Sequence, residues 1–185
     1  MRFTIRPATR GDLPALLPLI EAATSELLRP FLTTAQVESS RAIMGLDTQL
    51  IDDGTYYTVL GGTDLAGCGG WSRRATLYGG DHSSGRDAAL LDPAADPARI
   101  RAMYTHPSFA RRGVGRLILA HCESAAAAEG FTTASLVATL AGRPLYEAAG
   151  YQPVEHLTDD SGGAPVPLVR MRKTLTGAGP GPGRG

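Results

Sequence analysis

Hydrophobic and polar positions repeat with two different periods along the first fifty residues. Residues 3–6 alternate as in a short strand that ends at a proline. From residue 12, an aspartate suited to an N-cap, apolar side chains recur every three or four positions to residue 23, which predicts a helix. A second helical pattern covers residues 34–44. Residues 46–51 predict one or two further helical turns, which end at Gly54.

The next segment predicts a β-hairpin followed by a long loop. Residues 56–60 and 65–71 are rich in β-formers, and a Gly-Gly-Thr-Asp turn separates them. Three glycines between residues 67 and 70 predict a bulge or a close backbone neighbour. Residues 73–97 are polar and rich in Gly, Asp and Pro. Loops of this length in compact domains are often functional.

The second half of the chain alternates between strands and helices. The most regular pattern is a helix over residues 114–129, ended by a glycine. The other elements expected there are a helix at 144–149 and strands at 98–105, 133–138, 152–156 and 166–173. The order β-α-α-β-β-β-α-β-α-β-β predicts an α/β (α+β) fold with a mixed sheet and helices on both faces. We expect one domain over residues 1–175 and a disordered Gly/Pro tail over residues 176–185.

Composition narrows the classes of partner. The 185 residues carry 18 Lys+Arg and 18 Asp+Glu, so the formal net charge is zero. This balance argues against a nucleic-acid partner and against a membrane surface held by charge. Apolar runs stay well short of the ~20 residues of a membrane span, and the Arg-containing start does not look like a signal peptide. A cytoplasmic protein is expected.

The two cysteines, Cys68 and Cys122, are too few for a disulfide framework or a Cys-x-x-Cys metal site. Each stands in an apolar stretch, which predicts free, buried thiols. No metal site is expected.

The chemically most informative segment is Ala-Arg-Arg-Gly-Val-Gly-Arg at residues 110–116, between a strand and the strongest helix. The first N–H groups of a helix have no intrahelical acceptor, and glycine lets a ligand approach them. Arginine guanidinium groups match phosphate oxygens, so a phosphate or pyrophosphate is the natural ligand. The same seven residues, taken alone, fit a tight turn with solvated arginines equally well.

Two common nucleotide-binding motifs do not match. The G-x-G-x-x-G dinucleotide fingerprint needs a third glycine where Ile118 stands. The G-x-x-x-x-G-K-[ST] phosphate loop needs a lysine, and the only lysine of the chain is Lys173. Both nucleotide-binding classes are therefore disfavoured.

Two motifs together resemble the GNAT superfamily of acyl-CoA N-acyltransferases. Residues 103–107, Met-Tyr-Thr-His-Pro, followed by residues 111–116 are similar to its motif A, and residues 145–151, Leu-Tyr-Glu-Ala-Ala-Gly-Tyr, are similar to its motif B. The opening Ile-Arg-Pro-Ala at residues 5–8, followed by Asp12 and an apolar helix, is also similar to the common start of the family. The order and spacing of all three match over about residues 3–174. The resemblance implies the acyl-CoA N-acyltransferase fold, whose mixed sheet is mostly antiparallel. The sequence departs from the family pattern at Ala110, Thr139 and Gly142.

The resemblance implies acetyl-CoA as the acyl donor. Its pyrophosphate would lie on the backbone N–H groups of residues 111–116, and its pantetheine arm would pair with the strand through Met103 and Thr105. An amide N–H near Met103 would polarise the thioester carbonyl. The residues expected to bind this co-substrate are Met103, Tyr104, Thr105, Arg111, Arg112, Gly113, Val114, Gly115 and Arg116.

Tyr146 of motif B is the expected general acid that protonates the departing sulfur. A phenol with a pKa near 10 is protonated at neutral pH. The alternative for Tyr146 is a packing role in a short amphipathic helix. The motif A strand carries Arg99 and Arg101 instead of a carboxylate, so the sequence does not identify a base. The weak candidates for the base are Glu26, Asp81 and His82, and Phe31, Trp71 and Tyr78 are candidates for lining an acceptor pocket.

The resemblance thus predicts an N-acetyltransferase in which a primary amine attacks the thioester directly. The acceptor is a small molecule or a peptide, and a homodimer is a possible assembly. The alternative is a non-catalytic acyl-CoA-binding or regulatory module on the same fold.

Overall fold

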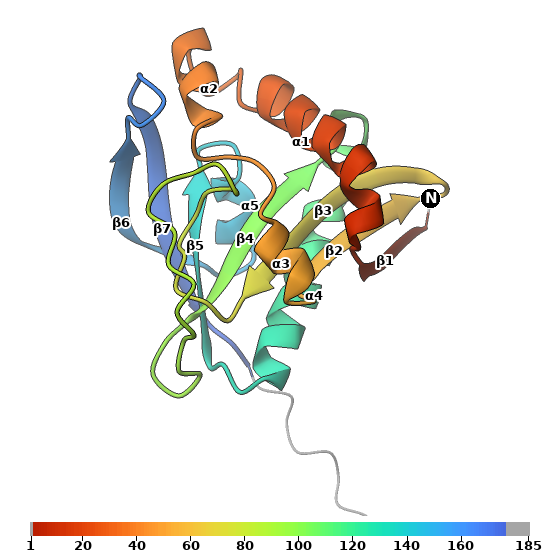
Figure 1. The fold of residues 1–185 in the computed structure, drawn as a ribbon, viewed down its shortest axis with the longest axis vertical. Coiled ribbons are helices and arrows are strands. Elements are labelled where there is room, and N and C mark those ends of the chain that lie inside the picture. The colour runs from red at the N-terminus through yellow and green to blue at the C-terminus, as the bar shows by residue number, and fades with distance from the viewer. Residues whose placement is uncertain (1, 177–185) are drawn as a thin grey trace, which may run out of the picture.

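The computed structural model describes residues 2–176 and contains one seven-stranded sheet with helices on both faces (Figure 1). The strands are β1 (Phe3–Pro7), β2 (Tyr56–Gly61), β3 (Asp64–Ser72), β4 (Ala98–Thr105), β5 (Thr133–Thr139), β6 (Gln152–Asp159) and β7 (Val166–Thr174). The α-helices are α1 (Leu13–Leu27), α2 (Thr34–Ser40), α3 (Thr48–Asp52), α4 (Val114–Ala128) and α5 (Arg143–Ala148). This order matches the expected one except before β2, where the one or two helical turns expected at residues 46–51 form a third helix, α3. The expected disordered tail lies outside the described residues from residue 177 onward.

The sheet has the strand order β1-β2-β3-β4-β5-β7-β6, and its central pair is unlike the others. Five of the six neighbouring pairs are antiparallel, whereas β4 and β5 are parallel. These two strands pair only at Ala98–Ala134 and Arg99–Ser135. Because the pairing stops at their first residues, β4 and β5 separate toward their C-terminal ends, as Figure 1 shows.

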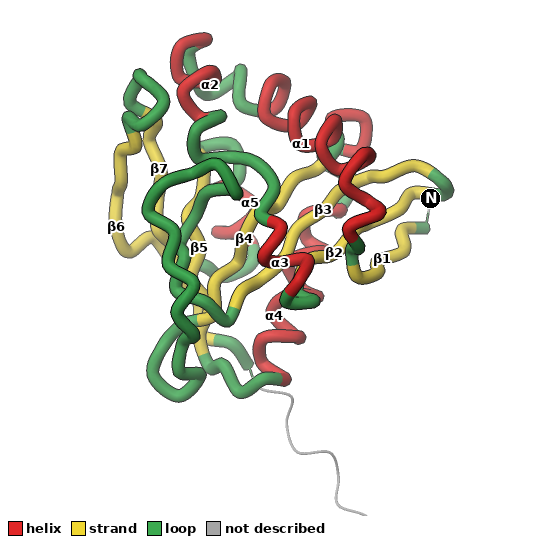
Figure 2. Tube along the Cα trace, in the orientation of Figure 1, coloured by secondary structure: helices red, strands yellow, loops and turns green. Residues whose placement is uncertain are grey.

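Each face of the sheet is covered by its own set of helices. The largest apolar cluster lies on the face of α4, where Ile118, Cys122 and Ala126 are completely buried. On the opposite face, α1 packs on the sheet through residues such as Leu16 and Ile20. A third cluster joins the end of α1 and α2 to β7. Figure 2 shows these helices in red around the strands. This burial on both faces follows the 3–4-residue spacing of apolar positions in α1 and α4.

The glycines of β3 allow α4 to lie close to the sheet. A Cβ atom at Gly67 would come 2.5 Å from the Val114 side chain, and one at Gly69 would come 2.8 Å from Ile118. Contacts under 3.0 Å essentially never occur for real Cβ atoms. The close neighbour predicted from these glycines is therefore helix α4.

The expected long loop, residues 73–97, lies on the face of the sheet opposite α4 (Figure 2). Its two ends pair with each other through an isolated bridge between Arg74 and Leu90. Near its start, the loop contacts the end of β6, where the Tyr78 hydroxyl donates to Asp159 at 2.8 Å. Among the described residues, none of the helices has the length and apolar character that a membrane span needs.

Candidate functional site

The separation of β4 from β5 is accompanied by a bulge in β4. Arg101 pairs with Gly70 and Tyr104 with Cys68, so two residues of β4 stand opposite the single residue Gly69. One of the two, Ala102, has φ +50°, a left-handed conformation that is uncommon for a residue with a side chain. The bulge lies beside the gap between the strands, where regular pairing of β4 is lost.

The turn from β4 into α4 presents free backbone donors at the same end of the sheet. A short 3₁₀ turn at Pro107–Phe109 leads to Gly113, whose φ of +88° suits glycine and begins the helix. Within the described chain, the backbone N–H groups of residues 111–116 donate to no acceptor. The N-terminal end of α4 adds partial positive charge to these donors.

Three arginine side chains surround these donors. Arg111, Arg112 and Arg116 are exposed, and none of them forms an ion pair within the described residues. The Arg112 guanidinium lies 5.7 Å from the centre of the Phe109 ring and borders an open cavity of about 700 Å³. Free amides together with uncompensated guanidinium groups make a site for a phosphate-bearing ligand.

Motif B lies against motif A in space. The Tyr146 hydroxyl contacts Met103 Sδ at 3.8 Å, so α5 reaches the bulged part of β4. A Cβ atom at Gly115 would lie 2.8 Å from Leu145 Cδ2 and 4.0 Å from the Thr105 hydroxyl. The expected site residues of β4, α4 and α5 are therefore neighbours around the open end of the β4–β5 gap.

Burial raises the pKa of Tyr146 well above its usual value. The neutral phenol is thus the form present at physiological pH, and it carries a proton that it can donate. Its ring packs edge-to-face with Tyr151, with 6.0 Å between the centroids. Tyr146 is therefore held in a fixed direction by packing and is only half-buried.

Two of the expected binding residues have side chains that serve other purposes, and a third, Gly115, has no side chain. The Val114 side chain is 1% exposed and belongs to the core. The Tyr104 hydroxyl donates to the Gly45 carbonyl and accepts from the Gly45 N–H at 2.8 Å. These contacts lie on the face of the sheet that α1 covers. Gly115 is needed for contact with α5. At these three positions, therefore, only backbone atoms are available to contact a ligand.

The candidates for the base are not gathered at this site. Glu26 is exposed on α1. The Asp81 carboxylate accepts from the N–H and hydroxyl of Thr48, and His82 Nε2 lies 2.7 Å from the Arg41 carbonyl. Asp81 and His82 therefore fasten the long loop to residues 41–48.

Of the residues proposed to line an acceptor pocket, Trp71 does not fit. It is 1% exposed and packs edge-to-face with Phe131 in the core beneath α4. Phe31 is half exposed, after the end of α1. Tyr78 joins the apolar cluster of α2 and β7, on the face opposite α4.

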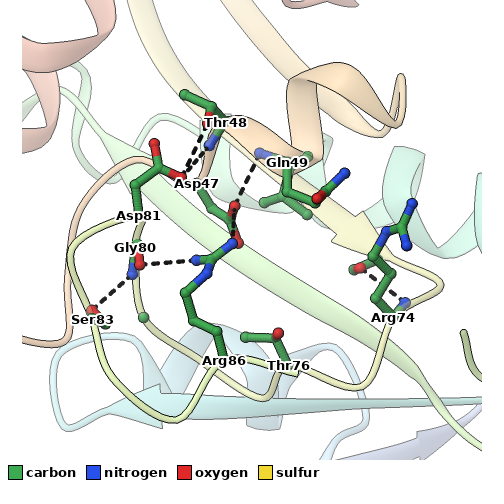
Figure 3. Close-up of polar contacts among 12 residues, drawn as sticks. Asp47, Thr48, Gln49, Arg74, Thr76, Gly80, Asp81, Ser83 and Arg86 are labelled. Atoms are coloured by element: carbon green, nitrogen blue, oxygen red, sulfur yellow. Dashed lines mark hydrogen bonds and ion pairs between the residues drawn. The ribbon is translucent and has the colours of Figure 1, made fainter. Parts of the chain in front are cut away.

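A cluster of charged side chains that the sequence patterns did not predict holds the long loop (Figure 3). Asp47 accepts from Arg86 at 2.8 Å, as Figure 3 shows. It also accepts from Arg101 at 2.9 Å, and the Arg101 and Asp47 side chains are each 2% exposed. Arg101 also donates to the carbonyl groups of Thr76 and Gly79. Burial lowers the pKa of Arg101, while the charge of Asp47 opposes that shift. An arginine on the strand of motif A thus anchors the loop.

Neither cysteine is placed for chemistry. Cys68 and Cys122 are free and buried, as expected. Burial raises the pKa of Cys68 to about 12 and also raises that of Cys122, so both thiols stay protonated and unreactive. In residues 2–176, no group of three His, Cys, Asp or Glu side chains is arranged to hold a metal ion.

Comparison with known proteins identifies the family. The family model described as "Acetyltransferase (GNAT) domain" matches residues 54–153, which is more than half of the chain and includes both motifs. The chain belongs to the GNAT acetyltransferase family. A comparison with curated proteins finds no match.

Solved structures share the fold of this GNAT protein across nearly its whole length. A GCN5-related N-acetyltransferase from Rhodopseudomonas palustris has a TM-score of 0.70 at 17% identity, over 95% of this chain and 97% of the other. The PaiA N-acetyltransferase from Thermoplasma acidophilum, solved with coenzyme A, has a TM-score of 0.64 at 14% identity, over 94% and 99%. The ribosomal-protein-S18-alanine N-acetyltransferase from Escherichia coli has a TM-score of 0.57 at 17% identity, over 97% and 98%. At these identities the likeness concerns the fold alone.

Proposed function

We propose that this GNAT protein transfers the acetyl group of acetyl-CoA to a primary amine, by direct attack of the amine on the thioester. The observation that carries the proposal is the 3.8 Å contact between the Tyr146 hydroxyl and Met103 Sδ. It supports a role for the Tyr146 hydroxyl as proton donor, because that hydroxyl lies beside the bulge of β4, at the open end of the β4–β5 gap. Family membership supports the acetyl transfer, and the related structure solved with coenzyme A supports the donor.

The residues present suit the donor. The pyrophosphate of acetyl-CoA would be held by the free N–H groups of residues 111–116 and by Arg111, Arg112 and Arg116. The edge of β4 near Met103 and Thr105 has no strand partner on the β5 side, since pairing with β5 ends at Arg99. An extended pantetheine arm would supply amide groups to pair with that edge.

In the chemical step, the amine nitrogen forms a bond to the thioester carbonyl carbon and the C–S bond breaks. The Met103 N–H stabilises the negative charge that develops on the carbonyl oxygen. Tyr146 donates its proton to the departing sulfur, because a thiolate with a conjugate pKa near 8.5 leaves more easily when it is protonated. The proton lost by the amine passes to water, since the candidate carboxylates and His82 are engaged elsewhere or lie at the surface.

The state of the two thiols supports direct attack, without an acetylated cysteine. The protonated, buried Cys68 and Cys122 are poor nucleophiles. Intact-mass spectrometry of the enzyme during turnover should detect no acetyl adduct. A Cys68→Ala/Cys122→Ala variant should keep its turnover and lose some stability from weakened packing.

The test of the proposed function is an acetyl-CoA assay with a panel of small amines, amino acids and peptides with free N-termini. Release of coenzyme A that depends on an amine, together with an acetylated product, is the expected result. Tight binding of acetyl-CoA without transfer to any amine would instead support the non-catalytic acyl-CoA-binding module. Failure to bind acetyl-CoA would overturn both.

A further inference from the structure

The peptide group between Ala102 and Met103 is held by a residue two strands away. The Tyr56 hydroxyl, from β2, donates to the Ala102 carbonyl oxygen at 2.8 Å. Tyr56 is 0% exposed, and neither motif A nor motif B contains it. Its bond reaches across β3 to the bulge of β4, the strand that the proposed mechanism uses.

A glycine makes this long reach possible. Tyr56 pairs with Gly70 of β3, and Gly70 pairs with Arg101 of β4, so the three residues form one row across the sheet. A Cβ atom at Gly70 would lie 2.8 Å from Tyr56 Cδ2. The Tyr56 ring therefore passes over the bare backbone of Gly70 to reach the next strand.

The hydrogen bond compensates for two costs of the bulge. A left-handed conformation at a residue with a side chain, as at Ala102, is unfavourable. A bulge also disrupts the ladder locally, and a buried carbonyl without a donor is unfavourable. Burial raises the pKa of Tyr56 well above its usual value, so its hydroxyl stays a donor at any pH at which the protein is folded.

Holding the Ala102 carbonyl also fixes the next N–H group. The described chain contains no cis peptide bond, so the Ala102 carbonyl and the Met103 N–H point in opposite directions from one planar group. Because Tyr56 fixes the direction of the carbonyl, the N–H of Met103 is aimed away from Tyr56. Rotation of this single peptide group would turn the N–H away from the substrate.

We propose that Tyr56 is a positioning residue for acetyl transfer, which aims the Met103 N–H at the thioester carbonyl through its hydrogen bond to Ala102. This inference rests on the proposed function. It assigns to a core tyrosine a part in catalysis that is separate from substrate binding, because Tyr56 touches neither the α4 N-terminus nor Tyr146. Its loss should therefore affect kcat much more than the affinity for acetyl-CoA.

The decisive variant is Tyr56→Phe, which keeps the ring over Gly70 and removes only the hydroxyl. Removing an oxyanion donor entirely costs about 10²–10³ in kcat. Since the variant misdirects the Met103 N–H without deleting it, we expect a fall in kcat of about tenfold. The dissociation constant of acetyl-CoA should stay within about twofold, because the contacts to its phosphates are unchanged.

The matched control is Tyr57→Phe. Tyr57 is the next residue of β2 and is also buried. Its ring packs edge-to-face with that of His121 in α4, with 4.4 Å between the ring centroids. Its side chain lies on the other face of the sheet from Tyr56. Turnover of this control should match that of the wild type.

A spectroscopic measurement separates positioning from a general loss of structure. The infrared band of the thioester carbonyl in bound, ¹³C-labelled acetyl-CoA reports the strength of the hydrogen bond to its oxygen. In Tyr56→Phe, but not in Tyr57→Phe, this band should shift toward its value for free acetyl-CoA. All proteins are compared below the melting temperature of the least stable one.

An unchanged kcat and carbonyl band in folded Tyr56→Phe would overturn the inference. So would a fall in kcat without a shift of the band, because that result would indicate a structural role alone. The variants are compared with a wild-type enzyme that has been shown to bind acetyl-CoA and to transfer its acetyl group. Failure of the wild type contradicts the proposed function itself, so the two failures can be told apart.

Discussion

The Tyr146 hydroxyl lies 3.8 Å from Met103 Sδ, although the two residues are 43 positions apart in the chain. This contact joins helix α5 to the bulge of strand β4, and it brings the two sequence motifs into one site. It also fixes where the proposed proton donor lies relative to the backbone that would hold the thioester.

Replacing Tyr146 with Phe tests the proposed general acid. The ring and its packing on Tyr151 remain, so the melting temperature and acetyl-CoA affinity should change little. General acid catalysis contributes about 10²–10⁴-fold, and turnover should fall by a factor in that range. Steady-state kinetics and calorimetric titration measure the two effects.

Tyr151→Phe is the control for this variant. Tyr151 is a buried neighbour whose hydroxyl has no hydrogen-bond partner among the described residues, so its loss should leave turnover unchanged. If Tyr146→Phe keeps turnover within about threefold of wild type while chemistry limits the rate, Tyr146 is a packing residue.

Neutralising Arg111 and Arg116 together should weaken acetyl-CoA binding. Both side chains are exposed at the α4 N-terminus and form no ion pair within the described chain. We expect the Arg111→Gln/Arg116→Gln variant to bind at least tenfold more weakly, which is about 1.4 kcal/mol. Its affinity should also depend less on salt, since salt screens charge–phosphate attraction. Calorimetry at two ionic strengths provides both values.

Arg29→Gln is the matched control for the arginine variant. Arg29 is exposed just after the C-terminal end of α1, away from the α4 N-terminus, and it also forms no ion pair among the described residues. Equal loss of affinity in the control would point to a general charge effect. Unchanged affinity in the double variant would remove the proposed phosphate site.

Gly69→Ala should disturb both the bulge of β4 and the packing of α4 on the sheet. The new Cβ atom would lie 2.8 Å from both the Met103 and the Ile118 side chains and 3.2 Å from Met103 Cα. Overpacking of this kind typically costs about 1–3 kcal/mol. Chemical denaturation should report that loss, and turnover of the folded fraction should also fall because Met103 moves.

Gly11→Ala serves as the control for crowding, because the nearest atom to its Cβ lies at 3.5 Å, an ordinary contact distance. Its stability should stay close to that of the wild type. Wild-type stability in Gly69→Ala would mean that the approach of α4 to β3 is less close than described.

The Asp53–Arg74 ion pair should make stability depend on pH in the acid range. Arg74 donates two hydrogen bonds to the Asp53 carboxylate, at 2.7 and 2.9 Å, and lowers the pKa of that carboxyl. The folded-state pKa thus lies below the unfolded value of about 3.9. The stabilisation is present above the unfolded pKa and is lost as the pH falls through the folded one.

Urea denaturation of wild type and Asp53→Asn between pH 7 and pH 2.5 measures this contribution. The variant should be less stable at pH 7 and should lose less stability on acidification. Asp64→Asn, at an aspartate without an ion pair among the described residues, should follow the wild-type curve. Parallel curves for wild type and Asp53→Asn would show that the pair contributes no pH dependence.

Most of what the sequence determined is local. The helix beginning at Val114, the hairpin of β2 and β3, and the free donors before α4 follow from periodicity, turn residues and glycine placement, which act over a few neighbouring positions. The glycines of β3 predicted a bulge or a close backbone neighbour, and the structure has a bulge opposite Gly69 and close packing of α4 on Gly67 and Gly69. Motif order identified the family before any contact was known, and the family model confirms it.

The tertiary structure alone decided which side chains meet. The sequence left Trp71 open between an acceptor pocket and the core, and it assigned Tyr104 to the binding site. Packing buries Trp71 beneath α4 and turns the Tyr104 side chain toward Gly45. The Asp47–Arg101 pair and the Tyr56–Ala102 bond join residues 54 and 46 positions apart. Contacts of this kind depend on strand register and on a one-residue bulge, which reverse or redirect side chains without leaving a periodic signal in the sequence.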